Sequence, residues 1–526
     1  MFKKIKMNVY HGNKLMTSIT VFDGVKTIGG NKIFVEQNGT GVFLDFGMNF
    51  KKYQHFYQEF LKERSSRGIY DLLHLNLIPK LNIYRQDLIP ADLDVSLYPR
   101  LDIEVVLVSH PHMDHFGNIG LLNTDIPIIS SPISLALMKG IADSSNLTLN
   151  LEVAFYSKKT QGLSDKTLKA IKGAYKTRNM VSTDKVSDSL EKFLTTDIKH
   201  APERNGTIKP LECGEICDLS TNPTQFNINY YEVDHSIYGA TGYILSGDTS
   251  IAYTGDFRLH GERANKSRKF IHAAKDSSVL IIEGTRTSRE DINESEEEVY
   301  DTCLKVVQDA KGLVVADFSP RNFERLELFG KIAKKCNRET VVPAKQVYLL
   351  KALEQVDGVD RTSEILVFGE YKTGKKDWED NFLKNQVRYI DPIDIAAAPE
   401  SYILCFSLYD IKHLLDIKPE IGIYIYSSSE AFEEESEFDF IRLNNWLEHF
   451  GFMVHGFEII EHKGKIFPKF IKGFHASGHA SKSDLKWAID IIDPEYIIPV
   501  HTENPGWFKD NFDNVKLLKE GEKLGL

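Results

Sequence analysis

Cysteine is scarce in this sequence, and its scarcity limits the kinds of metal site that the chain can build. Only five cysteines occur among 526 residues, and none of them form a C-x-x-C pair. Cysteine zinc sites are usually built on such pairs, and an odd count of thiols fits a reducing compartment. Cys213 and Cys217 could hold a metal in principle, but two ordinary thiols are the simpler interpretation.

Long hydrophobic runs are missing too, which argues against a membrane protein. No apolar run reaches the roughly 18 residues of a membrane-spanning helix. The first residues, MFKKIKMNVYHGNK, contain lysines but no apolar stretch behind them, so a secretory signal is not predicted. We therefore expect a cytoplasmic protein without membrane contact. Its length suits two or three domains.

An excess of positive charge is absent as well. The formal net charge is −11, which excludes a broadly basic nucleic-acid-binding protein. Any contact with phosphate would have to come from a local patch or from a bound cation. The charge therefore neither supports nor excludes a nuclease that uses divalent ions.

What the chain does have is a dense group of metal-ligand side chains in SHPHMDHFG, residues 109–117. They come directly after DIEVVLVS, an apolar run typical of a buried strand. Imidazole nitrogen and carboxylate oxygen suit zinc, with manganese or iron as alternatives. A cluster of surface histidines is the ordinary alternative, but ligands packed at a strand end favour a metal site. The side chains concerned are His110, His112, Asp114 and His115.

Other predicted strands also end near a ligand-type residue. VFLDFG contains Asp45, FNINYYEVD precedes His235, the hairpin 241–258 ends near Asp256, and SVLIIEGT contains Glu283. From about residue 290, strands and helices alternate, which is typical of a doubly wound α/β domain.

Two stretches of the chain have the character of insertions. One covers about 51–100 and the other about 122–205. In the second, four lysines recur at spacings of three and four residues and would share one helix face. That face could be an RNA track, but a solvated face is the more common explanation. The four are Lys166, Lys169, Lys172 and Lys176.

The H-x-H-x-D-H pattern after a buried strand resembles the metallo-β-lactamase fold. In that fold a later histidine and a bridging aspartate complete the metal site, and His235 and Asp256 match them. Asp45 matches an early aspartate that orients ligands without being one.

Later motifs resemble the β-CASP nucleases, which include ribonuclease J. HASGHASKSDL (475–485) and IIPVHTENP (497–505) match the late motifs of that group. The resemblance assigns its acidic motif to Glu283 and its two histidine motifs to His479 and His501. A histidine at the last position is typical of the RNA-directed branch.

The resemblance implies an α/β protein, an αββα metallo-β-lactamase sandwich with an inserted doubly wound α/β β-CASP domain. The first part of the sandwich would span 1–288 and include both insertions. The β-CASP domain would span 289–458, and 459–526 would complete the sandwich.

The same resemblance implies two divalent metal ions, zinc before manganese or iron. One would be held by His110, His112, His235 and Asp256, and the other by Asp114, His115, Asp256 and His501. Asp114 is also counted as catalytic. His479 would be the general acid, with Glu283 supporting its charged ring. Singly, Glu283, His479 and His501 also have ordinary structural interpretations; together, in this order, they favour function.

Substrate contacts are sought in FSPRNFERL (318–326), a strand-to-helix turn whose first amides could cradle a phosphate. Such turns are also common without any ligand. Further phosphate candidates flank His479. The complete set of predicted contacts is Ser319, Arg321, Asn322, Arg325, Ser477 and Ser481.

The leading hypothesis is a metal-dependent ribonuclease that hydrolyses single-stranded RNA, as an endonuclease, a 5′-exonuclease or both. One alternative keeps the fold and takes small esters, thioesters or lactones, although such substrates need no large inserted domain. Another is a non-catalytic subunit of an RNA-processing complex, although every expected ligand type is present. The sequence leaves the oligomeric state open.

Overall fold

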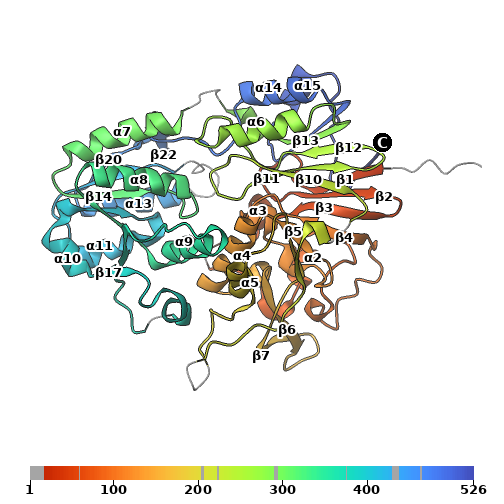
Figure 1. Cartoon of the computed structure of the whole chain (residues 1–526), viewed down its shortest axis with the longest axis horizontal. Coiled ribbons are helices and arrows are strands. Elements are labelled where there is room, and N and C mark those ends of the chain that lie inside the picture. The colour runs from red at the N-terminus through yellow and green to blue at the C-terminus, as the bar shows by residue number, and fades with distance from the viewer. Residues whose placement is uncertain are drawn as a thin grey trace, which may run out of the picture.

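The structure is a computed structural model that describes residues 17–58, 60–202, 207–221, 224–289, 294–374, 376–428, 437–462 and 465–526. Its two parts, a sandwich of two sheets and an inserted α/β domain, lie side by side (Figure 1). Among the described residues, no helix is long and apolar enough to cross a membrane. A cytoplasmic location stays a prediction.

The first sheet of the sandwich has eight strands in the order β24-β1-β2-β3-β4-β5-β8-β9. The pairs β1–β2, β2–β3 and β1–β24 are antiparallel, whereas β3 to β9 run parallel. The strands are β1 Thr17–Asp23, β2 Lys32–Gln37, β3 Thr40–Phe46, β4 Asp102–Leu107, β5 Ile128–Ser130, β8 Met180–Ser182, β9 Ile216–Asp218 and β24 Lys523–Gly525.

The second sheet has five strands in the order β10-β11-β12-β13-β23. The final strand comes from the far end of the chain and pairs in parallel with β13, placing Glu283 opposite Val500, next to His501. The strands are β10 Asn227–Glu232, β11 Thr241–Ser246, β12 Ser250–Tyr253, β13 Val279–Glu283 and β23 Tyr496–Val500.

Alternating side chains of the second sheet build two cores. Val279 and Ile281 of β13 face the first sheet, whereas Leu280 and Ile282 pack under helices on the outer face. This alternation is what a strand covered on both sides requires. The outer helices are α6 Ala264–Ala273 and α14 Lys482–Ile492, while α2 Tyr70–His74 and α4 Pro132–Ser144 cover the first sheet. The expected αββα sandwich is confirmed.

The inserted domain holds seven parallel strands in the order β17-β16-β15-β18-β14-β19-β20. They lie within residues 289–458, and helices pack against both faces of the sheet, as expected for a doubly wound domain. The strands are β14 Leu313–Asp317, β15 Glu339–Val342, β16 Ile365–Phe368, β17 Arg388–Ile390, β18 Tyr402–Cys405, β19 Gly422–Tyr426 and β20 Met453–His455.

The helices of the inserted domain include α9, which packs against α4 of the sandwich (Figure 1). Gly140 makes this approach close, because a Cβ there would lie 3.0 Å from the Leu349 side chain. The hairpin β21 Phe457–His462 and β22 Lys465–Phe470 follows the sheet. The helices are α7 Glu296–Asp309, α8 Phe323–Lys335, α9 Ala344–Asp357, α10 Pro392–Ala397, α11 Leu414–Ile417 and α13 Glu437–His449.

The second predicted insertion, 122–205, is in part integral to the sandwich, because β5 and β8 pair in the first sheet. The segment also contains α5 Asp188–Thr195. What projects from it is a hairpin of β6 Phe155–Gln161 and β7 Leu168–Thr177. The prediction that these lysines share one face of a helix is therefore wrong, because the segment forms a β-hairpin. Pairing with β6 supplies backbone hydrogen bonds to β7 and brings the Phe155 ring against Tyr175. The spacing of the lysines in the sequence carries no information about this pairing.

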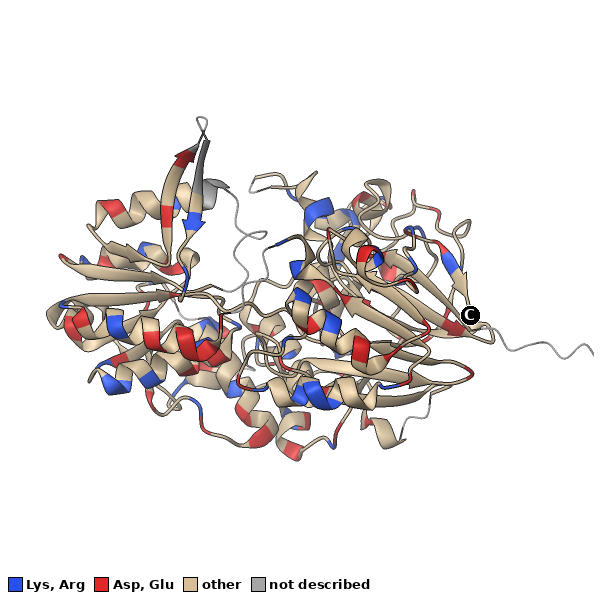
Figure 2. Ribbon diagram, turned by 90° about the horizontal axis from the view of Figure 1, so that it is seen from above, with Lys and Arg blue, Asp and Glu red and all other residues tan. Residues whose placement is uncertain are grey.

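Charged residues are spread over both parts of the molecule. Figure 2 shows Lys and Arg interspersed with Asp and Glu on the sandwich and on the inserted domain. This mixture fits the net charge of −11.

Candidate metal centre

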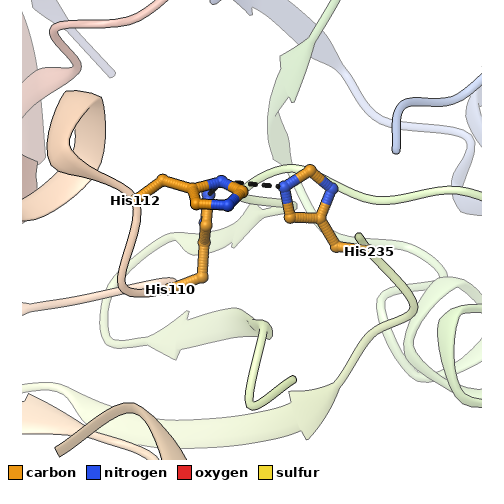
Figure 3. A group of neighbouring side chains, drawn as sticks. All are labelled: His110, His112 and His235. Carbon is orange, nitrogen blue, oxygen red and sulfur yellow. Dashed lines mark hydrogen bonds between the residues drawn. The ribbon is translucent and has the colours of Figure 1, made fainter. Parts of the chain in front are cut away.

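Three imidazoles converge at the end of β4 and at the loop after β10 (Figure 3). His112 Nδ1 lies 3.0 Å from His110 Nε2 and 3.2 Å from His235 Nε2. The His235 Nδ1–H donates to the Gly478 carbonyl at 2.6 Å, so its Nε2 lone pair faces the other two rings. Lone pairs this close are stabilised by a shared cation.

A second group of donors lies beside the first. Its members are Asp114, His115, Asp256 and His501, whose ligand atoms lie within 4.8 Å of one another. His501 Nε2 is 3.0 Å from Asp114 Oδ2, and His115 Nε2 is 3.0 Å from Asp256 Oδ2. Asp256 Oδ2 is also 3.6 Å from His110 Nε2, so this carboxylate stands between the two groups. All seven predicted ligands are thus brought together.

Close backbone approach places Asp114 at the start of the short helix α3, Met113–Phe116. The Gly30 amide donates to the Asp114 carbonyl at 2.9 Å. A Cβ on Gly47 would lie only 1.6 Å from that same carbonyl oxygen. A side chain at position 47 would therefore displace α3, which explains the glycine that follows β3.

The carboxylate of Asp45 holds His115 and the neighbouring Ser109 in place. It accepts hydrogen bonds from the Ser109 amide and hydroxyl, both at 2.7 Å, and from the Tyr253 hydroxyl at 2.6 Å. It also lies 2.7 Å from His115 Nδ1, which fixes the ring so that Nε2 faces Asp256. Asp45 and His501 have φ values of +57° and +51°, left-handed conformations that are uncommon for non-glycine residues.

The electrostatics favour the metal-binding forms of His110, His235 and Asp256. Burial, followed by repulsion from neighbouring imidazoles, lowers the pKa of His110 and of His235 well below its ordinary value. Burial opposes ionisation of Asp256, but His115 and a second imidazole hold its pKa well below the usual range. Neutral imidazoles and ionised carboxylates are the protonation states that ligate cations. At His115 burial opposes the charged form, but Asp256 and the other carboxylates around the ring raise its pKa well above the ordinary value, so a bound cation would have to displace that proton.

Two buried atoms of the centre lack a hydrogen bond of ordinary geometry within the described residues. They are His115 Nε2 and Asp256 Oδ1. Buried polar atoms are almost always satisfied, and the exceptions call for an ion or a water. Because both atoms belong to the donor group, the residues present fit a divalent cation.

A carboxylate–imidazole pair adjoins the donors. Glu283 Oε1 lies 3.3 Å from His479 Nδ1 and accepts a hydrogen bond from the Ala480 amide at 3.2 Å. Thr285 lies between this pair and the centre, since its hydroxyl is 3.2 Å from His479 Nδ1 and 2.9 Å from His501 Nδ1. Asp256, Glu283, His479 and His501 themselves form a group of close donor atoms.

A family comparison covers the segment that carries two of these residues. A family model described as "Zn-dependent metallo-hydrolase RNA specificity domain" matches residues 468–506, which include His479 and His501. "Ribonuclease J" of Pyrococcus abyssi (strain GE5 / Orsay) is 22% identical over 513 residues, 93% of this chain and 90% of that protein. "Ribonuclease J" of Mycoplasma genitalium (strain ATCC 33530 / DSM 19775 / NCTC 10195 / G37) is 20% identical over 528 residues, 93% of this chain and 68% of that protein.

The chain is a ribonuclease J-like protein with the metallo-β-lactamase/β-CASP fold. A crystal structure of a protein of unknown function from Enterococcus faecalis V583 shares this fold, with a TM-score of 0.65 and 20% identity over 97% of this chain and all of that one. This β-CASP protein is a metal-dependent hydrolase, and its clusters of His and Asp support the use of divalent metal.

The predicted substrate contacts of the β-CASP protein divide into two kinds. Asn322 and Ser481 are buried and cap α8 and α14, accepting hydrogen bonds from the backbone amides of Arg325 and Asp484. Arg325 is fully buried. The other three are partly exposed: Ser319 and Arg321, in the turn after β14, and Ser477, before His479.

Arg325 belongs to a buried ion-pair network that sequence reasoning missed. Arg325 Nη2 lies 2.9 Å from Glu296 Oε2, and Arg258 Nη1 lies 3.0 Å from Glu296 Oε1. Arg258 also pairs with Asp234 at 3.2 Å and with Glu324 at 2.5 Å. We call these five residues the arginine cluster; it joins the ligand-bearing loops to α7 and α8.

Local signals for the missed residues are weak. Ser109 and Thr285 stand next to predicted site residues in SHPH and EGT, so adjacency alone could have suggested them. Asp234 and Arg258 flank predicted ligands in the same way. Their partners, Glu296 and Glu324, lie in helix starts whose acids suit the helix dipole without any further role.

Proposed function

We propose that this protein is a metal-dependent ribonuclease that hydrolyses phosphodiester bonds of single-stranded RNA. The observation that carries the proposal is the convergence of two donor groups around Asp256, with the Glu283–His479 pair against them. Small esters are a poorer fit, since nothing about such substrates requires the β-CASP domain.

Two divalent ions would occupy the donor groups in this proposal. His110, His112 and His235 would hold one, and Asp114, His115 and His501 the other, with Asp256 shared. When bound, zinc, or alternatively manganese or iron, would lower the pKa of a water nucleophile and neutralise phosphate charge.

The residues of the chain complete the reaction. Attack on phosphorus expels an alkoxide, which needs a proton. Glu283 Oε1 accepts a hydrogen bond from Nδ1–H of the charged His479 ring, and the ring supplies the proton from Nε2. The Thr285 hydroxyl contacts Nδ1 of both His479 and His501 and so fixes the position of the His479 ring relative to His501.

Phosphates of the RNA would be held beside the centre by partly exposed groups. Ser319 and Arg321 follow β14, and Ser477 precedes His479 by two residues. The Ser477 carbonyl accepts a hydrogen bond from Arg258 and lies 2.9 Å from His260 Nε2, and the Ser477 hydroxyl oxygen accepts a hydrogen bond from the His479 amide at 3.1 Å. The hydroxyl proton would be the part of Ser477 that donates to a phosphate. Arg325, Asn322 and Ser481 keep the structural roles described above.

The test uses end-labelled RNA carrying either a 5′-monophosphate or a 5′-triphosphate. We expect purified protein with about two metal equivalents to cut it, and the double variant Asp114→Ala, His115→Ala to lose cutting. His272→Ala, on the exposed face of α6, is the matched control. The product ladder separates internal cleavage from 5′ removal. Normal cleavage by the double variant would exclude this site.

His479→Ala tests the proton donor separately. Loss of a general acid typically costs about 10²–10⁴-fold in rate, and we expect this loss without loss of bound metal. A panel of esters, thioesters and lactones run beside the RNA would expose the alternative hydrolase.

A further inference from the structure

Arg258 lies two residues after the candidate ligand Asp256, and its side chain is fully buried. Removing a guanidinium from water is strongly unfavourable unless carboxylates and carbonyls around it satisfy its charge and its donors. A guanidinium is also always protonated and has no lone pair to offer, so it cannot ligate a cation itself. The partners of Arg258 therefore show what this buried charge does.

The first partner ties together the two chain segments that carry His235 and Asp256. Arg258 Nε lies 3.2 Å from Asp234 Oδ1, and the Arg258 backbone amide donates to the Asp234 carbonyl at 2.8 Å. Asp234 directly precedes His235, so a side-chain contact and a main-chain hydrogen bond hold one ligand segment against the other. Gly261 closes over this contact, since a Cβ there would lie 2.5 Å from Arg258 Nε.

The second partner lies in the segment that carries His479. Arg258 Nη1 donates to the Ser477 carbonyl at 3.2 Å. The next carbonyl, that of Gly478, accepts from His235 Nδ1–H at 2.6 Å and so fixes which nitrogen of that ring faces the other imidazoles. Gly478 lies directly against the ring, because a Cβ there would lie 3.0 Å from His235 Cε1. The position of this peptide therefore sets the orientation of a candidate ligand.

The remaining partners belong to the inserted domain. Arg258 Nη1 lies 3.0 Å from Glu296 Oε1, and Nη2 lies 2.5 Å from Glu324 Oε2. The two glutamates lie in the first turns of α7 and α8. A planar fork with five donors can serve acceptors on several segments at once, which a lysine ammonium cannot do in the same geometry. One guanidinium thus joins three segments of the centre to two helices of the β-CASP domain.

We propose that Arg258 is a positioning residue of the metal centre, through which α7 and α8 of the inserted domain hold His235 and His479 in place. Residues that orient ligands in this way typically change metal affinity or activity by about 10–100-fold when they are removed. The inference rests on the metal centre proposed above, but it does not require RNA to be the substrate.

The test titrates cobalt(II) into protein freed of metal with a chelator and follows the visible absorption bands, which report the number and geometry of the ligands. Arg258→Met should weaken cobalt binding by about 10–100-fold. Its bands should also differ from those of the wild-type protein, because the His235 ring is no longer held by a fixed Gly478 carbonyl.

Arg325→Met is the matched control. Arg325 is also fully buried and pairs with Glu296, but its other partners are the carbonyl and hydroxyl of Ser427 and the Phe474 carbonyl. None of these residues adjoins a candidate ligand or His479. We expect this variant to lose stability in urea while its cobalt affinity and absorption bands stay as in the wild-type protein. Equal changes in both variants, or wild-type cobalt binding by Arg258→Met, would overturn the proposal.

Arg258→Lys keeps the positive charge in the cluster, so it carries the test even where Arg258→Met does not fold. Because an ammonium cannot reach the same acceptors, cobalt binding should again weaken in protein whose circular dichroism matches that of the wild type. Wild-type affinity and bands in this variant would show that charge alone is needed and would contradict positioning by the guanidinium. A wild-type protein that binds no cobalt would instead remove the metal centre itself, so the two failures are distinguishable.

Discussion

Two buried charged clusters of this protein use the same two segments of chain and differ in how they are satisfied. His235 and Asp256 belong to the metal centre, while Asp234 and Arg258, one and two residues away, belong to the arginine cluster. In the arginine cluster each guanidinium is paired with carboxylates, and the one unpartnered oxygen among its described atoms, Asp234 Oδ2, belongs to a carboxylate whose Oδ1 pairs with Arg258. In the centre, His115 Nε2 and Asp256 Oδ1 have no hydrogen-bond partner among the described residues.

The difference separates a ligand site from a structural one. Burial and charge are common to both clusters, so neither property marks function. Imidazoles and carboxylates that face one another without a basic side chain call for an external cation, whereas carboxylates that are already paired with guanidinium groups hold parts of the fold together. Four changes test this comparison, taken from the largest expected effect to the smallest.

Asp256→Asn should have the largest effect. The amide keeps the shape but removes the charge shared by both donor groups, so we expect at least about a 10⁴-fold loss of RNA cleavage, about 5 kcal/mol or more. Bound metal should fall as well, measured by elemental analysis. Asp248→Asn, in the exposed turn of the same hairpin, is the control. Full activity in Asp256→Asn would remove the basis for a shared carboxylate.

Arg258→Met should chiefly affect stability. It leaves Asp234 and Glu324 buried without a guanidinium, while Glu296 keeps Arg325, and breaking a buried ion pair in this way typically costs about 3–5 kcal/mol. Urea unfolding measures the loss. Lys334→Met, which removes an exposed ion pair, should change stability by less than about 1 kcal/mol. Equal effects of the two substitutions would show that the arginine cluster is not structural.

Metal removal should have an intermediate effect. Ions that bind only the folded state stabilise it by about 2.7 kcal/mol when their concentration is 100-fold above Kd. A chelator should therefore lower the thermal midpoint of the wild-type protein, as followed by scanning fluorimetry. The same chelator should shift Asp256→Asn much less. An unchanged wild-type midpoint would argue against resident metal.

The lysines of the β6–β7 hairpin should matter least. Lys166 and Lys169 are exposed and form no ion pair within the described chain, so Lys166→Ala, Lys169→Ala should alter stability by less than about 0.5 kcal/mol. We also expect RNA binding to change less than about twofold, measured by fluorescence anisotropy over a salt series. A marked drop in the salt dependence would identify the hairpin as an RNA track after all.

Prediction from sequence was most direct where the signal was local or matched a known motif. Four candidate ligands lie within six positions of SHPHMDHFG, so the sequence alone places them close together. His235, Asp256 and His501 lie far apart in the chain, and only the family resemblance linked them. Arg325 was expected to face a phosphate, yet it is paired with Glu296, because the packing of α7 on α8 is a long-range contact.

The amino-acid sequence by itself determined the kinds of donor atom, the order of sandwich and inserted domain, and the alternating strands that bury each sheet. These properties depend on residue type and short spacing. Tertiary structure alone decided which charges are mutually satisfied, that the lysine-rich segment is a hairpin, and that Arg258 joins the ligand-bearing loops to helices of the β-CASP domain. The physical reason is that satisfaction, strand pairing and contacts between domains depend on atoms brought together from distant parts of the chain.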